Sequence, residues 1–219
     1  MRTLAIETAT EACSVALFEN GRLLANAHNL VGRGHAERLV PMIGDLPERG
    51  RADRILVDCG PGSFTGVRVG LAAARGLGIA WSTPVHGFSS LALLAGMAGL
   101  DSERLAVAIV GGHGEVFVQL FSSVPPMHPV SEPRSLKPAE AAALCGALPV
   151  IGSGAELVLA AGATGPAQLL HPDARAVALV PPALTSKTAA GSARSCSALT
   201  SLEPRPLYGR APDARPRMP

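Results

Sequence analysis

Residues 54–81 read RILVDCGPGSFTGVRVGLAAARGLGIAW. The first six residues predict a short apolar strand, and Val67 to Trp81 read as a helix. Strand, glycine loop and helix in this order are typical of a crossover unit in an α/β protein. A glycine-rich loop at a helix N-terminus presents free N–H groups and the positive end of the helix dipole, which favours phosphate. The loop therefore contains three candidate residues for phosphate or nucleotide binding: Gly60, Gly62 and Ser63.

The established phosphate-loop signatures do not match this loop. The pattern G-x-G-x-x-G would need glycine at Thr65, and the Walker pattern would need a lysine where Val67 stands. Glycine is also common in tight turns that bind nothing. From the residues alone, turn packing and ligand binding both remain open.

The N-terminal residues predict a three-stranded antiparallel meander. Apolar, β-prone residues run from Thr3 to Thr8 and from Cys13 to Phe18, and a third strand follows the turn signal Asn20-Gly21. The tip of the first hairpin carries polar groups that could meet phosphate or could only cap turn amides. These groups belong to Glu7, Thr8 and Thr10.

The remaining chain predicts a helix near 35–46, a strand over 84–88, a helix over 89–99, a second hairpin over 105–121 and a mostly irregular proline-rich segment over 122–138. A short helix over 139–144, a strand at 150–152 and a last helix from Thr185 or Ser186 to Leu199 complete it. The sequence thus predicts two α/β lobes with related beginnings. The expected domains are 1–103, 104–202 and a tail rich in proline and arginine, 203–219.

Composition excludes several classes of protein. The 219 residues are 47% hydrophobic, 16% charged and 3% aromatic, with net charge +2. This composition can bury a core but lacks the aromatic side chains of a base-stacking surface. The four cysteines form no C-x-x-C pair and the six histidines no H-x-x-x-H pair, so we expect no disulfide framework and no bound metal. Without a signal peptide or a long apolar run, the chain is expected to be cytoplasmic, away from membranes.

A stripe of small residues marks the predicted helix after the glycine loop. Gly66, Gly70, Ala74 and Gly78 are four apart and therefore share one face. Each glycine costs about 1 kcal/mol of helix propensity relative to alanine, so a close approach of another element should compensate. That element could be the protein's own sheet or a second subunit that also contacts the helix near 36–46.

Three segments closely resemble the TsaB family, formerly YeaZ: residues 4–17 (LAIETATEACSVAL), 35–43 (HAERLVPMI) and 60–71 (GPGSFTGVRVGL). The resemblance implies an α/β fold of two ribonuclease-H-like lobes, of the actin-like ATPase (ASKHA) superfamily. It also implies a non-catalytic dimerisation and activating subunit that supports the TsaD transferase in making N6-threonylcarbamoyladenosine at position 37 of tRNA. Glu7 stands where the family usually has aspartate.

The resemblance further implies the partners and the contact surface. The partners are TsaD in a heterodimer, TsaE within the complex, tRNA through the complex, and a second copy when the chain is alone. The chain itself binds no cofactor tightly, while ATP or ADP and Mg²⁺ act at the level of the complex. The implied interface residues are Leu39, Val40, Ile43, Gly66, Gly70, Ala74 and Gly78.

Two rival functions come from other classes. One is a weak nucleotide-binding, ATPase-like module that uses the glycine loop and Glu7. The other is a glycoprotease-like peptidase in which Ser63 or His35 would act, although the sequence spaces no recognisable base for Ser63.

Overall fold

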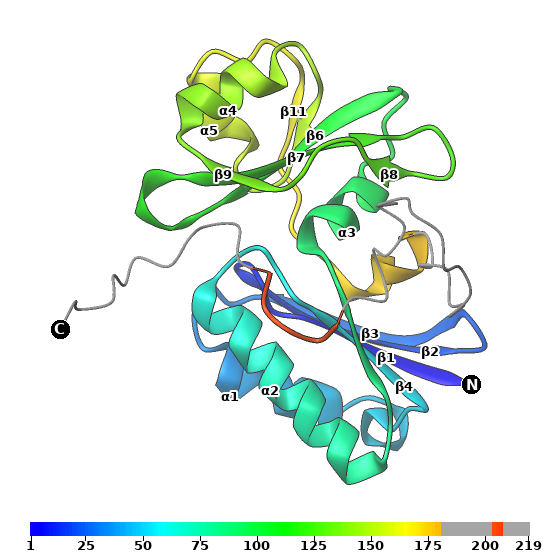
Figure 1. Ribbon diagram of the computed structural model, residues 1–219. Coiled ribbons are helices and arrows are strands. Elements are labelled where there is room, and N and C mark those ends of the chain that lie inside the picture. Colours follow the sequence, from blue (N-terminus) through cyan, green and yellow to red (C-terminus); the bar gives the residue numbers. More distant parts are fainter. Residues whose placement is uncertain (181–202, 208–219) are drawn as a thin grey trace, which may run out of the picture.

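The computed structural model describes residues 1–180 and 203–207, and its first lobe is built on a five-stranded sheet (Figure 1). The strands are β1 (Arg2–Glu7), β2 (Ala12–Glu19), β3 (Arg22–Leu30), β4 (Arg54–Asp58) and β5 (Val85–Phe88), in the order β3-β2-β1-β4-β5. The first three are antiparallel, which confirms the predicted meander, and β4 and β5 run parallel to β1. Asn20 and Gly21 form the second turn with φ of 51° and 80°, as a tight hairpin requires.

Helices cover both faces of this sheet. On one face lie α1 (His35–Gly44) and α2 (Phe64–Trp81), and on the other lie α3 (Ser90–Met97) and the 3₁₀ helix η3 (Ala174–Leu179) (Figure 1). A short 3₁₀ turn, η1 (Pro47–Gly50), follows α1. Pro41 lies inside α1 without ending it, and α2 begins three residues before the predicted start.

The second lobe repeats the strand order of the first. Its strands are β6 (Arg104–Val110), β7 (Val116–Ser122), β8 (His128–Pro129), β9 (Arg134–Leu136), β10 (Val150–Ile151) and β11 (Ala167–Gln168). Their order is β11-β10-β6-β7-β8, with β9 also paired to β7. Because the hairpin β6–β7 occupies the place of β1–β2, and β10 and β11 those of β4 and β5, the structure supports the duplication suggested by the two related beginnings.

Short helical pieces join these strands. The 3₁₀ turn η2 (Gly112–Gly114) closes the β6–β7 hairpin, while α4 (Pro138–Cys145) and α5 (Ala155–Ala160) pack on the sheet. The prediction that most of residues 122–138 is irregular is confirmed, although the short strands β8 and β9 within it both pair with β7. Proline is tolerated there because these strands lie at the sheet's edge. The predicted last helix, 185–199, lies outside the described residues.

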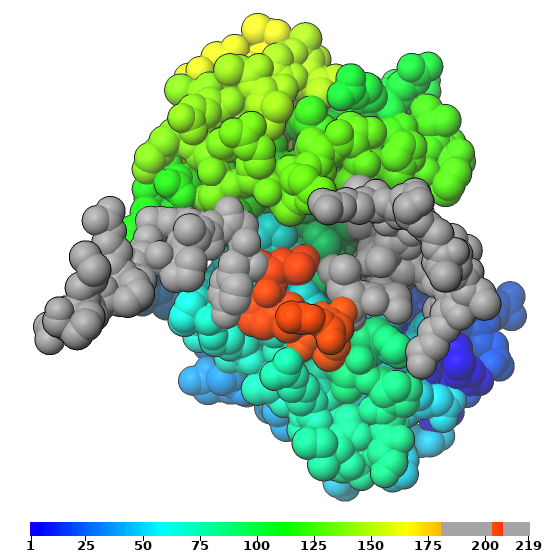
Figure 2. Space-filling model, viewed as in Figure 1, coloured from blue at the N-terminus to red at the C-terminus, as the bar shows by residue number. Residues whose placement is uncertain are grey.

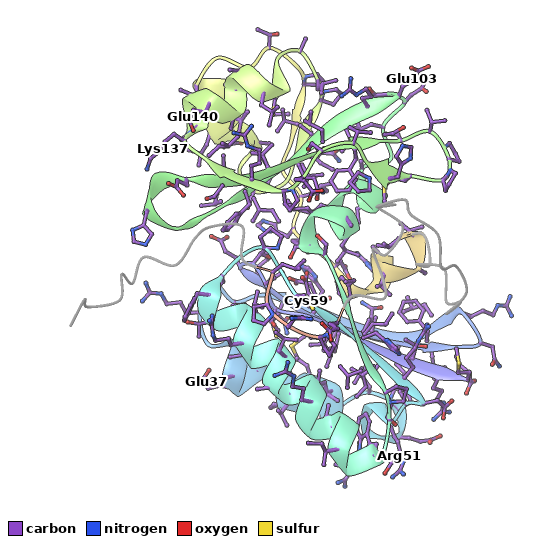
Figure 3. All side chains as sticks on the ribbon, in the orientation of Figure 1. Glu37, Arg51, Cys59, Glu103, Lys137 and Glu140 are labelled. Carbon is purple, nitrogen blue, oxygen red and sulfur yellow. The ribbon has the colours of Figure 1, made fainter. Side chains whose placement is uncertain are left out.

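The two lobes share one hydrophobic cluster. It joins the α3 side of the first sheet to β6, β7 and β10 of the second, and η3 returns from the second lobe to complete it. Residues 203–207 also return to the first lobe, where the Leu207 N–H donates to the Cys59 carbonyl at 2.7 Å. Figure 2 shows this segment in red on the surface of the first lobe, and Figure 3 labels Cys59 beside it.

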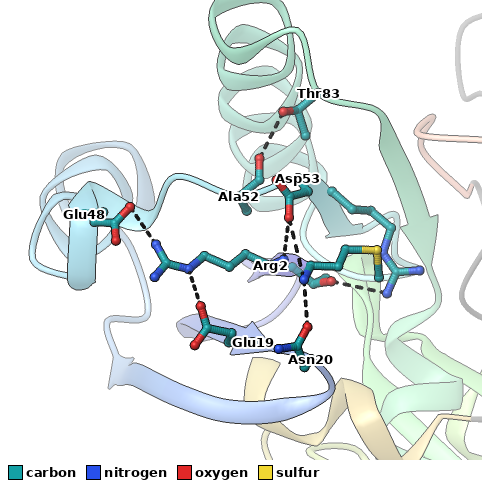
Figure 4. A network of polar contacts seen from close by, with 10 residues as sticks. Arg2, Glu19, Asn20, Glu48, Ala52, Asp53 and Thr83 are labelled. Atoms are coloured by element: carbon teal, nitrogen blue, oxygen red, sulfur yellow. Dashed lines mark hydrogen bonds and ion pairs between the residues drawn. The ribbon is translucent and has the colours of Figure 1, made fainter.

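A polar network fixes the N-terminal end of β1 (Figure 4). Arg2 donates from Nε to Glu19 at 2.9 Å, contacts Glu48 at 2.7 Å, and its backbone N–H donates to Asp53 at 2.7 Å. These contacts hold β1 against its neighbours at the end far from the glycine loop. Within residues 1–180 and 203–207, no helix has the length and apolar character needed to cross a membrane.

Candidate functional site

The glycine loop lies tightly against the first hairpin turn. A Cβ at Gly62 would stand 2.0 Å from the Ala9 carbonyl oxygen, and one at Gly66 would stand 2.0 Å from the Thr8 carbonyl oxygen. The backbone N–H of Ser63 donates to the same Ala9 oxygen at 2.6 Å. Glycine is therefore needed at positions 62 and 66 because two backbones approach each other closely.

Hydroxyl groups of the two loops are used in bonds within the chain. Thr8 Oγ1 donates to the Gly66 carbonyl at 2.8 Å, and Ser63 Oγ accepts from the Gly66 N–H at 3.2 Å as the N-cap of α2. Thr10 Oγ1 accepts from Ala12 N–H at 3.2 Å. Thr10 thus caps a turn amide, the alternative that the sequence left open beside phosphate binding, whereas Thr8 donates to a carbonyl and Ser63 caps α2.

The structure brings together the six residues nominated for nucleotide binding. Glu7, Thr8, Thr10 and Gly60 are buried, Gly62 is partly buried, and Ser63 alone of the six is exposed. Gly60, at φ 92°, faces the Leu207 carbonyl. The arrangement is thus two interlocked turns at the carboxyl ends of β1 and β4.

Two acids end these neighbouring strands. Glu7 Oε1 accepts from Ala9 N–H at 2.7 Å, while Asp58 Oδ1 accepts from Gly60 N–H at 2.7 Å and from Ser90 Oγ at 2.8 Å. Burial raises the pKa of Asp58 to about 7. Burial and, secondly, the charge of Asp58 raise the pKa of Glu7 well above its usual range. Asp58 was not among the predicted site residues, although an acid at the end of the strand predicted before the glycine loop was a visible signal.

His35 has a structural role. Its Nε2 lies 2.9 Å from the Thr10 carbonyl and 3.0 Å from the Ala12 carbonyl, so the tautomer with hydrogen on Nε2 donates to both. The contact ties the start of α1 to the first hairpin. No group of three metal-ligating side chains occurs in the described part of the chain.

The stripe of small residues lies against the protein's own sheet, one of the two alternatives that the sequence left open. A Cβ at Gly70 would stand 2.4 Å from Thr8 Oγ1, and one at Gly78 would stand 2.6 Å from Val85 Cγ2. Ala74 is fully buried. Leu39 and Ile43 of α1 are buried in the same core. This corrects the expectation that these residues, together with Gly66, contact another subunit. Their side chains and backbone pack against other parts of the same chain.

The opposite side of the same helices carries exposed apolar and small residues, with charged Glu37 and Arg75 at neighbouring helical positions. Val40, the remaining residue of the expected interface, is 63% exposed and Ile79 is 83% exposed. We call this surface the outer face; its members are Ala36, Val40, Gly44, Ala72, Gly76, Ile79 and Ala80. Ala72, Gly76 and Ala80 repeat the four-residue spacing of the buried stripe, a signal that the sequence analysis overlooked. Figure 3 labels Glu37, which is exposed on α1 three residues before Val40 and therefore borders this face.

Comparison with known proteins gives consistent matches. A family model described as "TsaD: tRNA N6-adenosine threonylcarbamoyltransferase" matches residues 28–144. The "tRNA threonylcarbamoyladenosine biosynthesis protein TsaB" of Escherichia coli is 41% identical over 125 residues, covering 53% of each chain. Its namesake in Haemophilus influenzae is 38% identical, covering 55% of this chain and 52% of the relative. The chain thus spans about half the length of these curated relatives in the matched region.

Solved structures match over a greater length. A Pseudomonas aeruginosa protein described as similar to peptidase YEAZ is 31% identical, with TM-score 0.76 and coverage of 95% of this chain and 99% of that one. A structure titled "YeaZ from Pseudomonas aeruginosa" is 32% identical, with TM-score 0.70 and coverage of 82% and 90%.

Two lobes with one repeated strand order, joined at the carboxyl ends of β1 and β4, define a protein of the actin-like ATPase fold. The sequence matches and the solved structures then give the family. The chain belongs to the TsaB (YeaZ) family of tRNA threonylcarbamoyladenosine biosynthesis proteins.

Proposed function

We propose that this chain is a non-catalytic subunit that binds a TsaD-type transferase and holds it in its active form for the synthesis of N6-threonylcarbamoyladenosine on tRNA. Membership of the TsaB family supports a role in tRNA threonylcarbamoyladenosine biosynthesis. Internal hydrogen bonds of Thr8 and Ser63 support the lack of a catalytic role for the glycine loop, because both hydroxyls already serve the fold.

The observation that carries the proposal is the outer face of α1 and α2. Monomeric proteins seldom expose contiguous apolar surface of functional size without using it. Here Val40 and Ile79 are exposed among small residues, and a Cβ at Gly76 would meet nothing within 4 Å. Small side chains let the backbone of a partner helix approach, and the two aliphatic side chains supply area that binding removes from water.

The partner that fits this face is a relative with the same fold. A TsaD-type protein shares the fold type, and its corresponding helices could pack on α1 and α2 in a nearly two-fold arrangement. The same apolar face accepts a second copy of this chain when no transferase is present. TsaE and tRNA then join through the complex, where ATP or ADP and Mg²⁺ act.

The experiment compares two alanine-to-arginine variants. Ala72→Arg places a charge on the outer face, while Ala143→Arg places one at an exposed helical position of the second lobe. Each is co-expressed with the TsaD-type protein of the same genome, and the complex is measured by size exclusion with mass determination and by product formation on tRNA. We expect Ala72→Arg to lose complex and product at least tenfold, because desolvating an unpaired charge costs more than 1.4 kcal/mol.

The control separates an interface effect from a folding effect. Ala143→Arg should behave as the parent chain does, and Ala72→Arg should keep the parent's unfolding temperature. A normal complex with Ala72→Arg, or full product formation without this chain, would refute the proposal.

A further inference from the structure

A row of polar side chains crosses the first sheet on the face covered by α3 and η3. The strand register places Glu7 opposite Ser14, and Ser14 opposite His28. On the other side, Ile6 pairs with Val57, so the next residues, Glu7 and Asp58, end adjacent parallel strands side by side. Apolar neighbours of the row on this face belong to the cluster shared by both lobes.

Each of the two acids has one satisfied and one unsatisfied oxygen. Glu7 Oε1 and Asp58 Oδ1 accept the hydrogen bonds described above, but Glu7 Oε2 and Asp58 Oδ2 are buried without any hydrogen-bond partner. Both side chains are 0% exposed. Two adjacent carboxylates without counter-charge would each lose hydration and repel the other. A single proton on one of the two unsatisfied oxygens removes one charge and supplies the missing donor.

We propose that Glu7 and Asp58 share one proton, which the carboxyl group of one residue donates to the carboxylate of the other, and that this proton keeps the first sheet closed against α3 and η3. The boundary between the first sheet and the helices α3 and η3 is here called the seam. When the proton is lost to solvent, two neighbouring carboxylates remain in this seam. The proposal is independent of the outer face and of the partner assigned to it.

The acids lie at contacts that hold this seam together. Ser90, the first residue of α3, donates from Oγ to Asp58 and from its backbone N–H to the Gly60 carbonyl at 3.1 Å. On the other side, Ser14 Oγ donates to Asp173 at 3.2 Å and accepts from the Ala174 N–H at 2.9 Å. The chain passes from α3 directly into β6, so charge in the seam acts where the lobes join (Figure 1).

Among residues 1–180 and 203–207, the surrounding ionisable groups leave the pair without a strong counter-charge. Asp173, ahead of η3, has its own cation in Arg175 at 2.7 Å, and His28 Nδ1 lies 3.6 Å away from it. The negative charge of Asp173 further raises the pKa of Glu7. Burial raises the pKa of the Cys13 thiol to about 11, so this β2 neighbour stays neutral.

In the described part of the chain, the elements on the Asp58 side add no cation beside the acids. Burial raises the pKa of Cys59 to about 12, and the charge of Arg75 on α2 acts on that thiol in the opposite direction. Helix α3 carries no ionisable side chain.

The pH dependence has a defined sign. Both acids bind a proton more tightly in the folded chain than in the unfolded one. The folded state therefore holds more protons between about pH 4 and pH 7, and the stability that this gives falls as pH rises through that window. Above the folded-state pKa of the pair, the full penalty of buried charge remains.

The test uses the full chain and two isosteric variants. Asp58→Asn keeps an acceptor for Gly60 and Ser90, and its amide N–H can donate to Glu7. Asp101→Asn makes the same chemical change at an exposed loop position. Thermal unfolding is measured from pH 5 to pH 8.5, with hydrogen exchange of residues 90–97 corrected for the intrinsic rate.

We expect the parent chain and Asp101→Asn to lose unfolding temperature as pH rises and to exchange α3 amides several-fold faster at pH 8 than at pH 6. Asp58→Asn should show a smaller change in both. If Asp58→Asn keeps the parent's pH dependence, the proposal is overturned. If 5 mM MgCl₂ raises the unfolding temperature of the parent but not of Asp58→Asn at pH 8, the pair binds a cation and the proposal is likewise overturned.

A measurement on the unaltered chain does not depend on any variant folding. Carbon-13 NMR of the side-chain carboxyl groups should show one proton leaving the Glu7–Asp58 pair near or above pH 7. Both carboxyl groups titrating below pH 5 would contradict a shared proton.

Discussion

Thr8 and Gly66 hold the two loops of the first lobe together through both of their backbones. The Thr8 hydroxyl donates to the Gly66 carbonyl at 2.8 Å. A Cβ at Gly66 would stand only 2.0 Å from the Thr8 carbonyl oxygen. One contact is a hydrogen bond and the other is a steric limit. Together they explain why the hairpin tip needs a threonine and why the start of α2 needs a glycine.

Gly66→Ala should destabilise the chain by about 3 kcal/mol, because the added methyl group meets backbone that cannot rotate away. Gly76→Ala, on the exposed side of the same helix, should leave the free energy of unfolding unchanged or raise it by up to about 1 kcal/mol, because alanine has the higher helix propensity. Urea denaturation of both variants provides the measurement. Equal effects of the two substitutions would show that helix propensity, and not the close approach of Thr8, explains the glycine at position 66.

Thr8→Val should cost about 1–2 kcal/mol, since it removes a buried hydroxyl that donates to Gly66 while preserving the shape of the side chain. The matched change Thr65→Val, at an exposed position of α2, should alter stability by less than about 0.5 kcal/mol. Unfolding free energies of the two variants settle the comparison. A Thr8→Val chain as stable as the parent would argue against this bond.

Cys13, Cys59 and Cys145 should react slowly with a thiol reagent at pH 8 in the folded chain. All three are buried, and burial raises the pKa of Cys13 and Cys145 to about 11 and that of Cys59 to about 12, so the reactive thiolate is scarce. The measurement uses Cys196→Ser to remove the fourth thiol and counts released chromophore before and after adding denaturant. Rapid labelling before denaturation would contradict this burial.

Ile79→Glu should shift the free chain toward monomer if the outer face also binds a second copy. The side chain is 83% exposed, so the folded monomer tolerates a charge there, whereas a dimer would bury it. Sedimentation across a concentration series should show weaker association by at least about tenfold in the dissociation constant. The exposed Leu157→Glu in α5 serves as the control and should leave association unchanged.

Sequence patterns predicted the elements whose signals are local. The Asn20-Gly21 turn, the apolar, β-prone runs of β1 and β2, and the glycine loop before α2 each depend on residues that are neighbours in the chain, so composition and turn chemistry identified them. Short strands such as β8 and β9 were missed because their stability comes from pairing with β7, a contact that no local pattern encodes.

The sequence alone determined that α2 has a face of small residues and that the loop before it requires glycine. Only the tertiary structure decided which of two small-residue faces lies inside: Gly66, Gly70 and Gly78 lie against the sheet, while Gly76 is open. The reason is physical. Spacing along a helix defines its faces, but the direction each face points depends on the elements that pack against it, and the adjacent acids Glu7 and Asp58 likewise meet only through strand pairing.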